Sequence, residues 1–412
     1  MRVNKPATTL IILIIFLGGN VNAQTPLNLN QAIELGLKNN QQIQANELNI
    51  KAQNQLKPTA KELPKTKINA MLGQYNTRSF DQNYSISQEF NPFQFQAKKE
   101  LINANIKNSE LELLVTKQDV TSQIRRSWNM ISYYLALNNL LQKQEEYLQI
   151  FVKAATLKFK TGESSLLEKI TAETKQQALI QTRKQNEGMI LSEKIKLKSI
   201  LNLKGDIVLF EDEFLPVKAF VADSVYINQN SVLVLATQQI GLANANKNVE
   251  KAQRKPDFII GYFIQSLTGN QDIEGNNIVY YNGKPRFQGV NLGITVPLFG
   301  KASKARVQAS KTVVLVQQKN AEYLKNQLSS QLLQQIEEQK VNQSLIDYHT
   351  KTALPNAEII SKNAQKSFQN GEIGYVEYLQ SLETVLKIEQ NYLNVINQFN
   401  QNNINIQYLL NN

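Results

Sequence analysis

Two matching stretches, "FKTGESSLLEKIT" (159–171) and "FQNGEIGYVEYLQ" (368–380), decide how this 412-residue chain folds. Each interrupts a long helical pattern with a Gly-Glu pair and then restarts it, with Glu168 and Glu377 at equivalent places. Because glycine lets a chain reverse direction at low steric cost, each stretch predicts the turn of a helical hairpin. A chain that makes the same turn twice is predicted to contain an internal duplication of one structural unit.

Prolines mark the same places in both copies of the unit. Pro64 and Pro92 in the first copy, and Pro256 and Pro297 in the second, bound stretches in which apolar and polar residues alternate. Proline suits the entry and exit of a strand, since these positions need no ladder N–H. The predicted strands cover 67–75, 84–91, 257–266 and 288–297. The two copies of the unit cover about 27–203 and 222–411, and a mixed connector joins them at about 204–221.

The helical patterns around these strands are very long. They cover 30–61, with Asn30 as the expected N-cap, then 97–160, 223–254 and 301–369. At 1.5 Å per residue the second would span roughly 95 Å, too long for a globular domain. Its apolar residues, such as Val120, Ile124 and Trp128, follow one narrow stripe, which predicts side-by-side packing as in coiled coils. Pro355 predicts a kink or an interruption in the last pattern.

The first 23 residues are predicted to be a secretory signal peptide. Arg2 and Lys5 precede the apolar run "LIILIIFL" (10–17), and small residues end at Ala23. The run is too short to span a bilayer as a helix, and an uncleaved anchor is the alternative. Since the chain has no cysteine, lipid attachment to cysteine and disulfides are both excluded.

The composition argues against several functional classes. The net charge is +11, but the lysines are spread among Gln, Asn and Glu along the sequence, which indicates solvated helix faces and no nucleic-acid partner. One histidine, His349, and no cysteine argue against a transition-metal site. There is no nucleophile–His–acid set and no phosphate-binding glycine loop, so neither an enzyme nor a cofactor is expected.

The strands have the length and alternation of tilted transmembrane β-strands. Aromatic residues near their ends predict an interfacial girdle of Tyr75, Tyr84, Phe90, Tyr262, Tyr280 and Tyr281. Four strands cannot close a barrel, and open edges in lipid leave backbone groups unpaired. The chain must therefore pool strands with copies of itself, and a wide lumen favours three copies over two. A soluble sheet with one face packed on the helices is the alternative.

Several stretches together resemble the TolC-type outer membrane efflux proteins over nearly the whole mature chain. They are "LNLNQAIELGLKNN" (27–40), "GITVPLFGKASKARVQASK" (293–311) and the two turn motifs. The resemblance implies a mainly α protein with a membrane β-barrel: a homotrimer with a shared 12-stranded outer membrane barrel above an α-helical barrel that crosses the periplasm.

The same resemblance implies the exit duct of a tripartite efflux pump, with a periplasmic adaptor and an inner-membrane transporter of the resistance–nodulation–division class as partners. "YSISQEFNP" (84–92) and "NGEIGYVEYLQSL" (370–382) are most similar to members that serve heavy-metal and cation pumps. The alternatives are the duct of a type I protein secretion system and a periplasmic coiled-coil structural protein. A passive porin would need more strands per chain.

The resemblance also implies functional residues at the two turns. Adaptor docking is expected at Gly162, Glu163, Ser164 and Ser165 and at Gly371, Glu372, Ile373 and Gly374. Just inside the turns, acidic residues one helical turn apart form a pore constriction in the family; here Glu377 and Gln380 match, so an amide replaces one carboxylate. Glycines that only form turns, and a solvated surface Glu377, are the alternatives.

Overall fold

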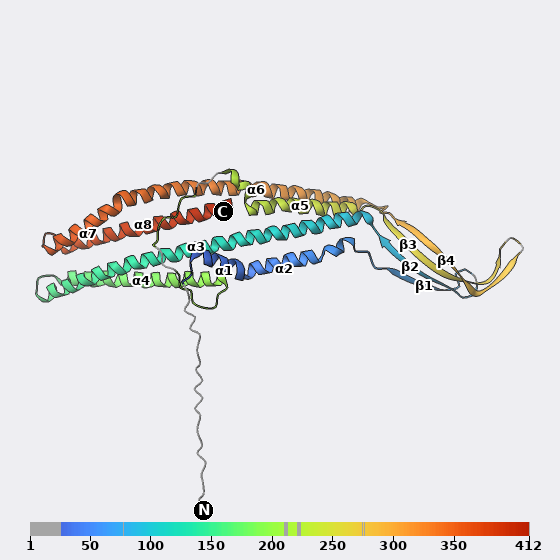
Figure 1. Cartoon of the computed structure of the whole chain (residues 1–412), viewed down its shortest axis with the longest axis horizontal. Helices are drawn as coiled ribbons and strands as arrows, with labels where there is room; N and C mark the ends of the chain where they lie inside the picture. The colour runs from blue at the N-terminus through green and yellow to red at the C-terminus, as the bar shows by residue number, and fades with distance from the viewer. Residues whose placement is uncertain are drawn as a thin grey trace, which may run out of the picture.

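The chain is described from a computed structural model that covers residues 26–411, apart from 77, 210–212, 221–223, 274 and 276. The predicted signal peptide lies outside the described residues. Figure 1 shows an elongated, mainly helical molecule, in which long helices run side by side between a four-stranded sheet at one end and two hairpin turns at the other. The predicted class of long helices with four strands is confirmed at this level.

The two halves of the chain have the same order of elements. The first half forms α1 (Leu29–Asn39), α2 (Gln41–Gln55), the 3₁₀ turn η1 (Lys57–Lys61), β1 (Lys67–Gly73), β2 (Asp81–Phe90), α3 (Pro92–Lys160) and α4 (Leu166–Leu201). The second half forms η2 (Ser224–Gln229), α5 (Ser231–Ala252), β3 (Asp257–Asp272), β4 (Ile278–Thr295), α6 (Lys301–Tyr348), the π-helical turn η3 (His349–Ala353), α7 (Leu354–Gln369) and α8 (Tyr375–Leu410).

The first predicted helix is in fact two helices, and its N-cap is Asn28, not Asn30. The Asn28 side chain accepts from the Gln31 N–H at 2.9 Å, and the Gln31 side chain accepts from the Asn28 N–H at 3.0 Å, which forms a capping box. Asn40 is extended and caps α2. The prediction of one continuous helix was wrong because the apolar periodicity runs through this break.

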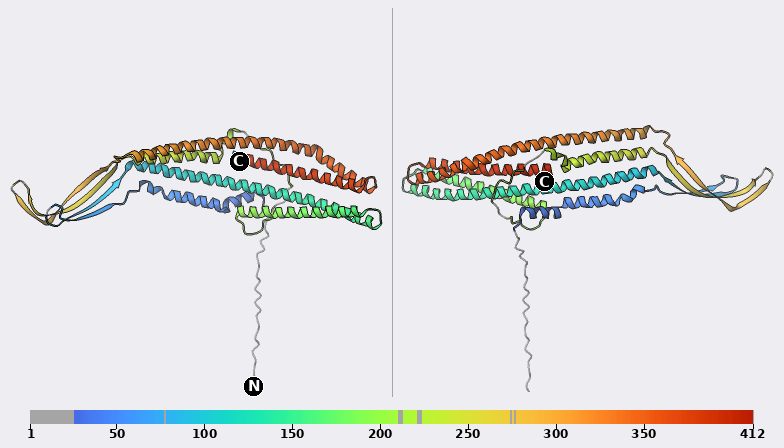
Figure 2. Two further views of the ribbon diagram at one scale, coloured as in Figure 1. Left: turned by 180° about the vertical axis from the view of Figure 1, so that it is seen from behind. Right: turned by 45° about the horizontal axis from the view of Figure 1, so that its top comes forward.

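Short helices lie end to end beside the long ones (Figure 2). In each half one asparagine connects two helix ends, and we call this arrangement an Asn joint. Asn40 accepts from the first N–H groups of α2 and donates to the Ile200 carbonyl at the end of α4. Asn230 does the same for α5 and the Leu409 carbonyl of α8. One amide therefore satisfies orphan groups at two helix ends.

The sheet is antiparallel throughout, in the order β1-β2-β3-β4, so β1 and β4 are its edges. The strands differ in length from the prediction: β2 begins at Asp81, while β3 and β4 extend past β2 as a longer hairpin with a bulge at Ser266/Thr268. The residues of the extension are rich in Asn, Gln and Gly, so sequence alternation did not reveal it.

The predicted interruption at Pro355 is confirmed. The π-helical turn at His349–Ala353 ends two residues before Pro355, and the Leu354 N–H donates to the His349 carbonyl. Proline removes one helical donor and crowds the carbonyl four residues back, and a π turn relieves both problems by re-pairing the backbone. Figure 1 shows the resulting bend between α6 and α7.

Apolar side chains are buried in separate patches along the length of the molecule. In the patch near the middle, Ala32, Ile124 and Leu201 are fully buried. Gly36 lets α1 approach α3, since a Cβ at Gly36 would lie 2.3 Å from the Ile124 Cδ1. Among the described helices, none contains a window apolar enough and long enough to cross a bilayer.

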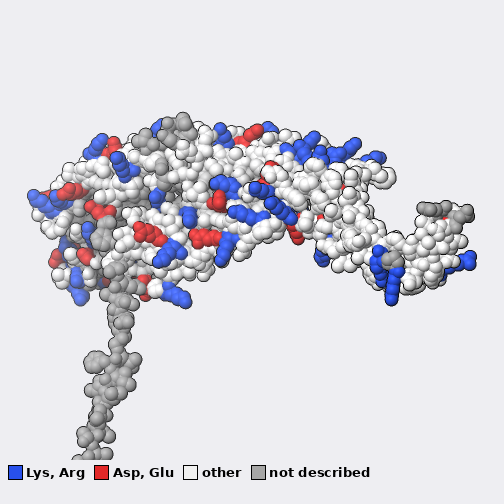
Figure 3. All heavy atoms as spheres, turned by 45° about the vertical axis from the view of Figure 1, so that its right-hand side comes forward, with Lys and Arg blue, Asp and Glu red and all other residues white. Residues whose placement is uncertain are grey.

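Folding gathers lysines that are scattered along the sequence. Segments 57–67, 89–100, 250–257 and 300–306 adjoin the strands and contain twelve Lys and Arg against five Asp and Glu. Figure 3 shows basic side chains concentrated over the end of the helices that meets the sheet. Lysines that are spread along the sequence are therefore brought together at this level of the molecule.

Candidate functional site: the hairpin turns and the exposed sheet face

The two hairpin turns have the same backbone. Gly162 and Gly371 have φ of 78° and 76°. In the first turn the Gly162 N–H donates to Phe159 and the Glu163 N–H to Lys158; in the second, Gly371 and Glu372 donate to the residues at the same offsets. This is the Schellman arrangement, which closes a helix through a left-handed residue. The structure therefore assigns both glycines a turn-forming role, whatever else binds there.

The return helices begin with different caps. The Ser165 Oγ accepts from the Glu168 N–H at 3.3 Å in the first turn. In the second, Gly374 has no side chain, and the Glu377 Oε2 instead accepts from the Gly374 N–H at 2.9 Å. Glu377 and Gln380 are both exposed. Glu377 thus has a capping role that the sequence comparison did not indicate.

Glu163 and Glu372 occupy equivalent positions but differ in their contacts. The Glu372 carboxylate accepts from the Ser367 hydroxyl at 2.8 Å and from the Asn370 amide at 3.1 Å. These two hydrogen bonds, the Ser367 bond foremost, lower the pKa of Glu372. Glu163 is exposed and has Lys158 and Thr161 at the corresponding positions. The second turn therefore presents a carboxylate held by two hydrogen bonds, whereas the Glu163 carboxylate of the first turn has no such bonds within the part of the chain that the structure describes.

An aromatic cluster joins the two hairpins just behind their turns. Phe151 from α3 lies 5.5 Å from Phe368, 4.8 Å from Tyr375 and 5.4 Å from Tyr378, measured between ring centroids. Phe368 stacks on Tyr378 at 4.6 Å. Burial, and then the charge of Glu168, raises the pKa of Tyr375 to about 12. The predicted docking residues of both turns are therefore held at one end of the molecule, as Figure 1 also shows.

Around the turns three large apolar side chains are exposed. Leu166, Leu167 and Val376, in the first turns of α4 and α8, are exposed, Leu167 to 76%. Ile373 packs against the aromatic cluster. The Ser164 Oγ and the Tyr375 hydroxyl are buried without a hydrogen-bond partner among the described atoms. An apolar surface with unpartnered polar atoms beneath it is suited to binding another protein.

The sheet has one apolar face and one face of polar and small residues. Strand pairing aligns Ile68, Ile86, Tyr262 and Val290 across all four strands on the apolar face. Exposure on this face reaches 78% at Ile68, 75% at Leu292 and 63% at Ile294. The opposite face carries Lys67, Ser87, Gly261 and Asn291 in the same way, and Ile259 and Phe263 are apolar exceptions on it. No described helix covers the apolar face, which excludes the alternative of a sheet packed on its own helices.

The six predicted girdle residues are distributed unevenly. Phe90 lies at the end of β2 and stacks on Phe258 at 6.0 Å. Tyr84 and Tyr262 lie nearer the middle of the sheet, because β2 begins earlier and β3 ends later than expected. Tyr280 and Tyr281 belong to the β3–β4 extension and, as neighbours in a strand, point to opposite faces. Tyr75 follows β1 in a bend.

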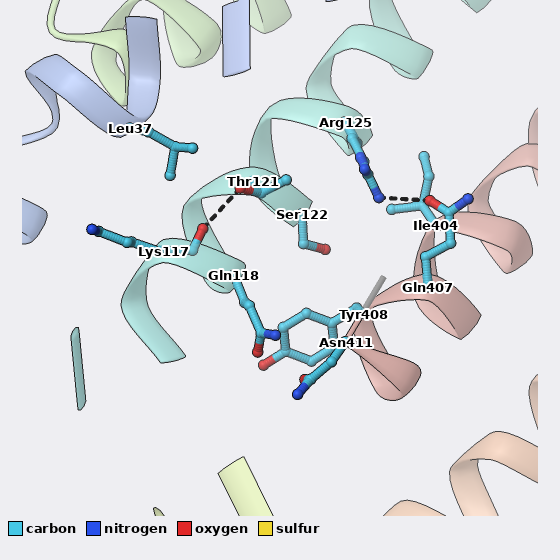
Figure 4. A pocket seen from close by; sticks show the side chains of 10 residues that line it. All are labelled: Leu37, Lys117, Gln118, Thr121, Ser122, Arg125, Ile404, Gln407, Tyr408 and Asn411. Carbon is cyan, nitrogen blue, oxygen red and sulfur yellow. Dashed lines mark hydrogen bonds between the residues drawn. The ribbon is translucent and has the colours of Figure 1, made fainter. Parts of the chain in front are cut away.

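The cavities offer no catalytic arrangement within the described residues. The one in Figure 4, about 180 Å³, lies between α3 and α8; there Arg125 donates to Gln407, and Tyr408 donates to Asp119 just outside. His349 is 6% exposed, and its ring lies 5.9 Å from the Tyr392 ring, tilted by 43°, at the π-helical turn. No group of three His, Cys, Asp or Glu in the described part of the chain could hold a metal ion.

No family model and no curated protein matches the sequence. The structure is similar to CusC, solved in work on conformational changes that accompany folding and transmembrane channel formation: identity is 15%, the TM-score is 0.75, and 93% of this chain and 91% of that chain are covered.

Two further structures agree. The outer membrane protein VceC from Vibrio cholerae has 13% identity and a TM-score of 0.75, with 93% of this chain and 95% of VceC covered. The open state of the Neisseria gonorrhoeae MtrE outer membrane channel has 14% identity and a TM-score of 0.74, with 93% and 88% covered. The chain therefore has the fold of the TolC-type outer membrane channels, as the sequence resemblance implied.

Proposed function

We propose that this protein is the outer membrane exit duct of a tripartite efflux pump, with its strands in the membrane and its helices in the periplasm. One observation carries the proposal: the sheet exposes a continuous apolar face across all four strands. Exposed Ile, Leu and Val at this density are unfavourable in water, at about 25 cal/mol for each Å². In lipid the same face is favourable, and the polar face then lines an aqueous lumen.

The edges of the sheet support an oligomer. β1 and β4 each have only one partner strand within the chain. In lipid, unpaired backbone groups cost several kcal/mol each, so β1 of one copy would pair with β4 of the next. Three copies give the 12-stranded barrel of a homotrimer, and the matching turns and Asn joints of the two halves support an origin by internal duplication.

The turns are the proposed docking surface for a periplasmic adaptor. Leu166, Leu167 and Val376 supply apolar contacts, and the Gly-Glu pairs supply shape and charge. Through the adaptor the duct would connect to an inner-membrane resistance–nodulation–division transporter. The motif similarity favours metal-cation or drug efflux.

Glu377 is the proposed selectivity residue at the periplasmic entrance, with Gln380 one helical turn further on. In a trimer, three Glu377 carboxylates about 6 Å apart would repel each other by roughly 0.7 kcal/mol per pair in bulk water and about 3 kcal/mol at an effective dielectric of 20. Such a ring favours cations.

Planar-bilayer recordings of the purified mature protein test the proposal. We expect a small, cation-selective conductance that loses selectivity in Glu377→Gln, where the amide can still cap α8. Glu377→Ala removes both charge and cap, so a difference between the two variants isolates capping. If Glu377→Gln leaves the conductance and its selectivity unchanged, the proposed role of Glu377 is refuted, but the proposal of a duct is not.

Two outcomes would favour the alternatives. A protein that stays soluble, shows no heat-modifiable migration and never conducts is the expected result for a periplasmic coiled-coil protein. A conducting protein that is co-isolated with a transporter of secreted proteins, and not with an efflux transporter, would indicate a type I secretion duct.

A further inference from the structure

A cluster of basic side chains lies where the helices meet the sheet. We call it the basic collar: Lys57, Lys61, Lys65, Lys67, Lys98, Lys99, Lys251, Arg254, Lys255, Lys301, Lys304 and Arg306. Only two of these form ion pairs within the described residues, Lys67 with Glu89 and Arg306 with Glu250. The collar therefore carries a large excess of positive charge that the chain itself does not neutralise (Figure 3).

A groove within the collar combines cations with an apolar floor. It has a volume of about 680 Å³ and lies between η1 and the start of α3. Lys57, Lys61 and Lys99 line it together with Pro58, Phe95 and Ile102. No described carboxylate lies within 4 Å of these three ammonium groups. Cations beside an apolar floor match a ligand with an anionic head and a hydrocarbon part.

Ring contacts connect the collar to the apolar face of the sheet. Phe258 belongs to that face, Phe93 lies 6.5 Å from it, and the Lys255 Nζ lies 5.9 Å from the centre of the Phe93 ring. Gln96, which lines the groove, follows Phe93 by three residues and so lies on the same side of α3. The groove and Lys255 therefore lie below the face proposed to contact lipid.

The proposed trimer would concentrate this charge further; the inference rests on that proposed function. If β1 of one copy pairs with β4 of the next, then η1 of the first copy lies beside the start of α6 of the second. Lys57 and Lys61 would then adjoin Lys301 and Lys304 across every seam. Like charges brought together in this way repel one another, and an anionic partner would relieve that repulsion.

We propose that the basic collar binds the headgroups of anionic phospholipids in the periplasm-facing leaflet, with the groove of Lys57, Lys61 and Lys99 as the principal site. Strands in the membrane place the collar at headgroup level. The phosphate and its neighbouring glycerol would meet the lysines, and the first part of the acyl chain would cover Phe95 and Ile102. Lysine near an anionic membrane surface contributes about five-fold each to binding.

Melting temperatures of the mature full-length protein in neutral detergent test this, with increasing phosphatidylglycerol or phosphatidylcholine added to the micelles. We expect phosphatidylglycerol to raise the melting temperature and phosphatidylcholine to have little effect. In the triple variant Lys57→Gln, Lys61→Gln, Lys99→Gln, half of the maximal rise should need ten- to a hundred-fold more phosphatidylglycerol. The matched control, Lys153→Gln, Lys184→Gln, Lys387→Gln, replaces exposed lysines far from the collar and should behave as the wild type.

Two control measurements test whether the effect comes from an anionic lipid bound through charge. Glycerol 3-phosphate at the same concentration should not stabilise the protein, which separates a lipid from a free phosphate. At high salt the effect of phosphatidylglycerol on the wild type should fall, since salt screens exposed charges. Equal stabilisation by both lipids, or an equal shift in the control variant, would overturn the proposal. Conductance of the wild type in neutral bilayers tests the duct separately, so a failed lipid site and a failed duct give different results.

Discussion

The Asn joints allow a quantitative test of how the short helices are held together. At Asn230, which is 1% exposed, the side-chain oxygen accepts from Val232 and Leu233 at 3.0 and 3.2 Å, and the amide donates to the Leu409 carbonyl at 3.0 Å. Asn230→Ala removes the N-cap, at about 1 kcal/mol, and leaves the Leu409 carbonyl buried without its donor, at about 1–3 kcal/mol. We expect a total loss of roughly 2–4 kcal/mol.

Asn230→Ser separates the two contributions, because serine caps a helix well but is too short to reach Leu409. It should cost about 1 kcal/mol less than Asn230→Ala. Thermal unfolding followed by circular dichroism in one detergent measures both variants; at about 2 °C per kcal/mol, Asn230→Ala should melt roughly 4–8 °C below the wild type. The half-buried counterpart provides the control: Asn40→Ala should cost less, since water can replace the lost donor at the Ile200 carbonyl.

The outcomes have distinct meanings. If Asn230→Ser is as stable as the wild type, the bond to Leu409 contributes nothing and the joint is only a cap. If Asn230→Ser is as unstable as Asn230→Ala, the cap contributes nothing. If Asn40→Ala is the more damaging change, then burial does not determine the cost, and the reasoning fails.

Four further predictions concern other parts of the fold. Gly162→Ala and Gly371→Ala should each cost about 1–2 kcal/mol of local stability through their left-handed backbone, seen as faster amide exchange at the turns, with Asn better tolerated than Ala. Gly36→Ala should cost about 1–3 kcal/mol in thermal unfolding, and Ile124→Val, which removes the clashing Cδ1, should restore part of it. Phe151→Ala should cost about 3–5 kcal/mol and speed exchange in both hairpins together, whereas loss of the exposed Lys175–Glu383 pair should change little. Folding lowers the pKa of Glu372, so its contribution to turn stability is present above its unfolded pKa. That contribution is lost as the pH falls through the pKa of the folded state. The difference in amide exchange between the wild type and Glu372→Gln should therefore be constant from pH 6 to 8 and shrink below about pH 4.

The sequence was sufficient wherever the structural cause is local. Gly162 and Gly371 adopt the left-handed backbone that makes Gly-Glu a turn signal, and Pro355 interrupts its helix through its own ring and missing N–H. Period-two alternation likewise located all four strands, since each side chain's face is set by its position in its own strand. These features need no knowledge of what lies elsewhere in the chain.

The features that were missed depend on partners distant in sequence. Asn40 lies in an ordinary amphipathic pattern, and only the arrival of α4 gives its amide the Ile200 carbonyl as partner. In the sequence Phe151 is one more apolar helix residue, and only the folded chain brings Phe368 of α7 and Tyr375 of α8 against it. The basic collar is assembled from four segments, none of which is strongly basic enough by itself to indicate a binding surface.

Glu377 illustrates how the structure changes the interpretation of a residue that the sequence had already singled out. As a pore residue, its carboxylate would have to point toward the other copies; here it points back to the Gly374 N–H and caps α8. The two roles compete for one carboxylate, because a group that caps the helix has less freedom to reach the lumen. At the first turn Ser165 caps α4, so Glu168 is not needed as a cap and lies beside Tyr375 instead. A carboxylate ring at the entrance would therefore form only when the Glu377 cap at the start of α8 is released, and Glu377→Gln, which keeps the cap while removing the charge, separates the gate from the fold.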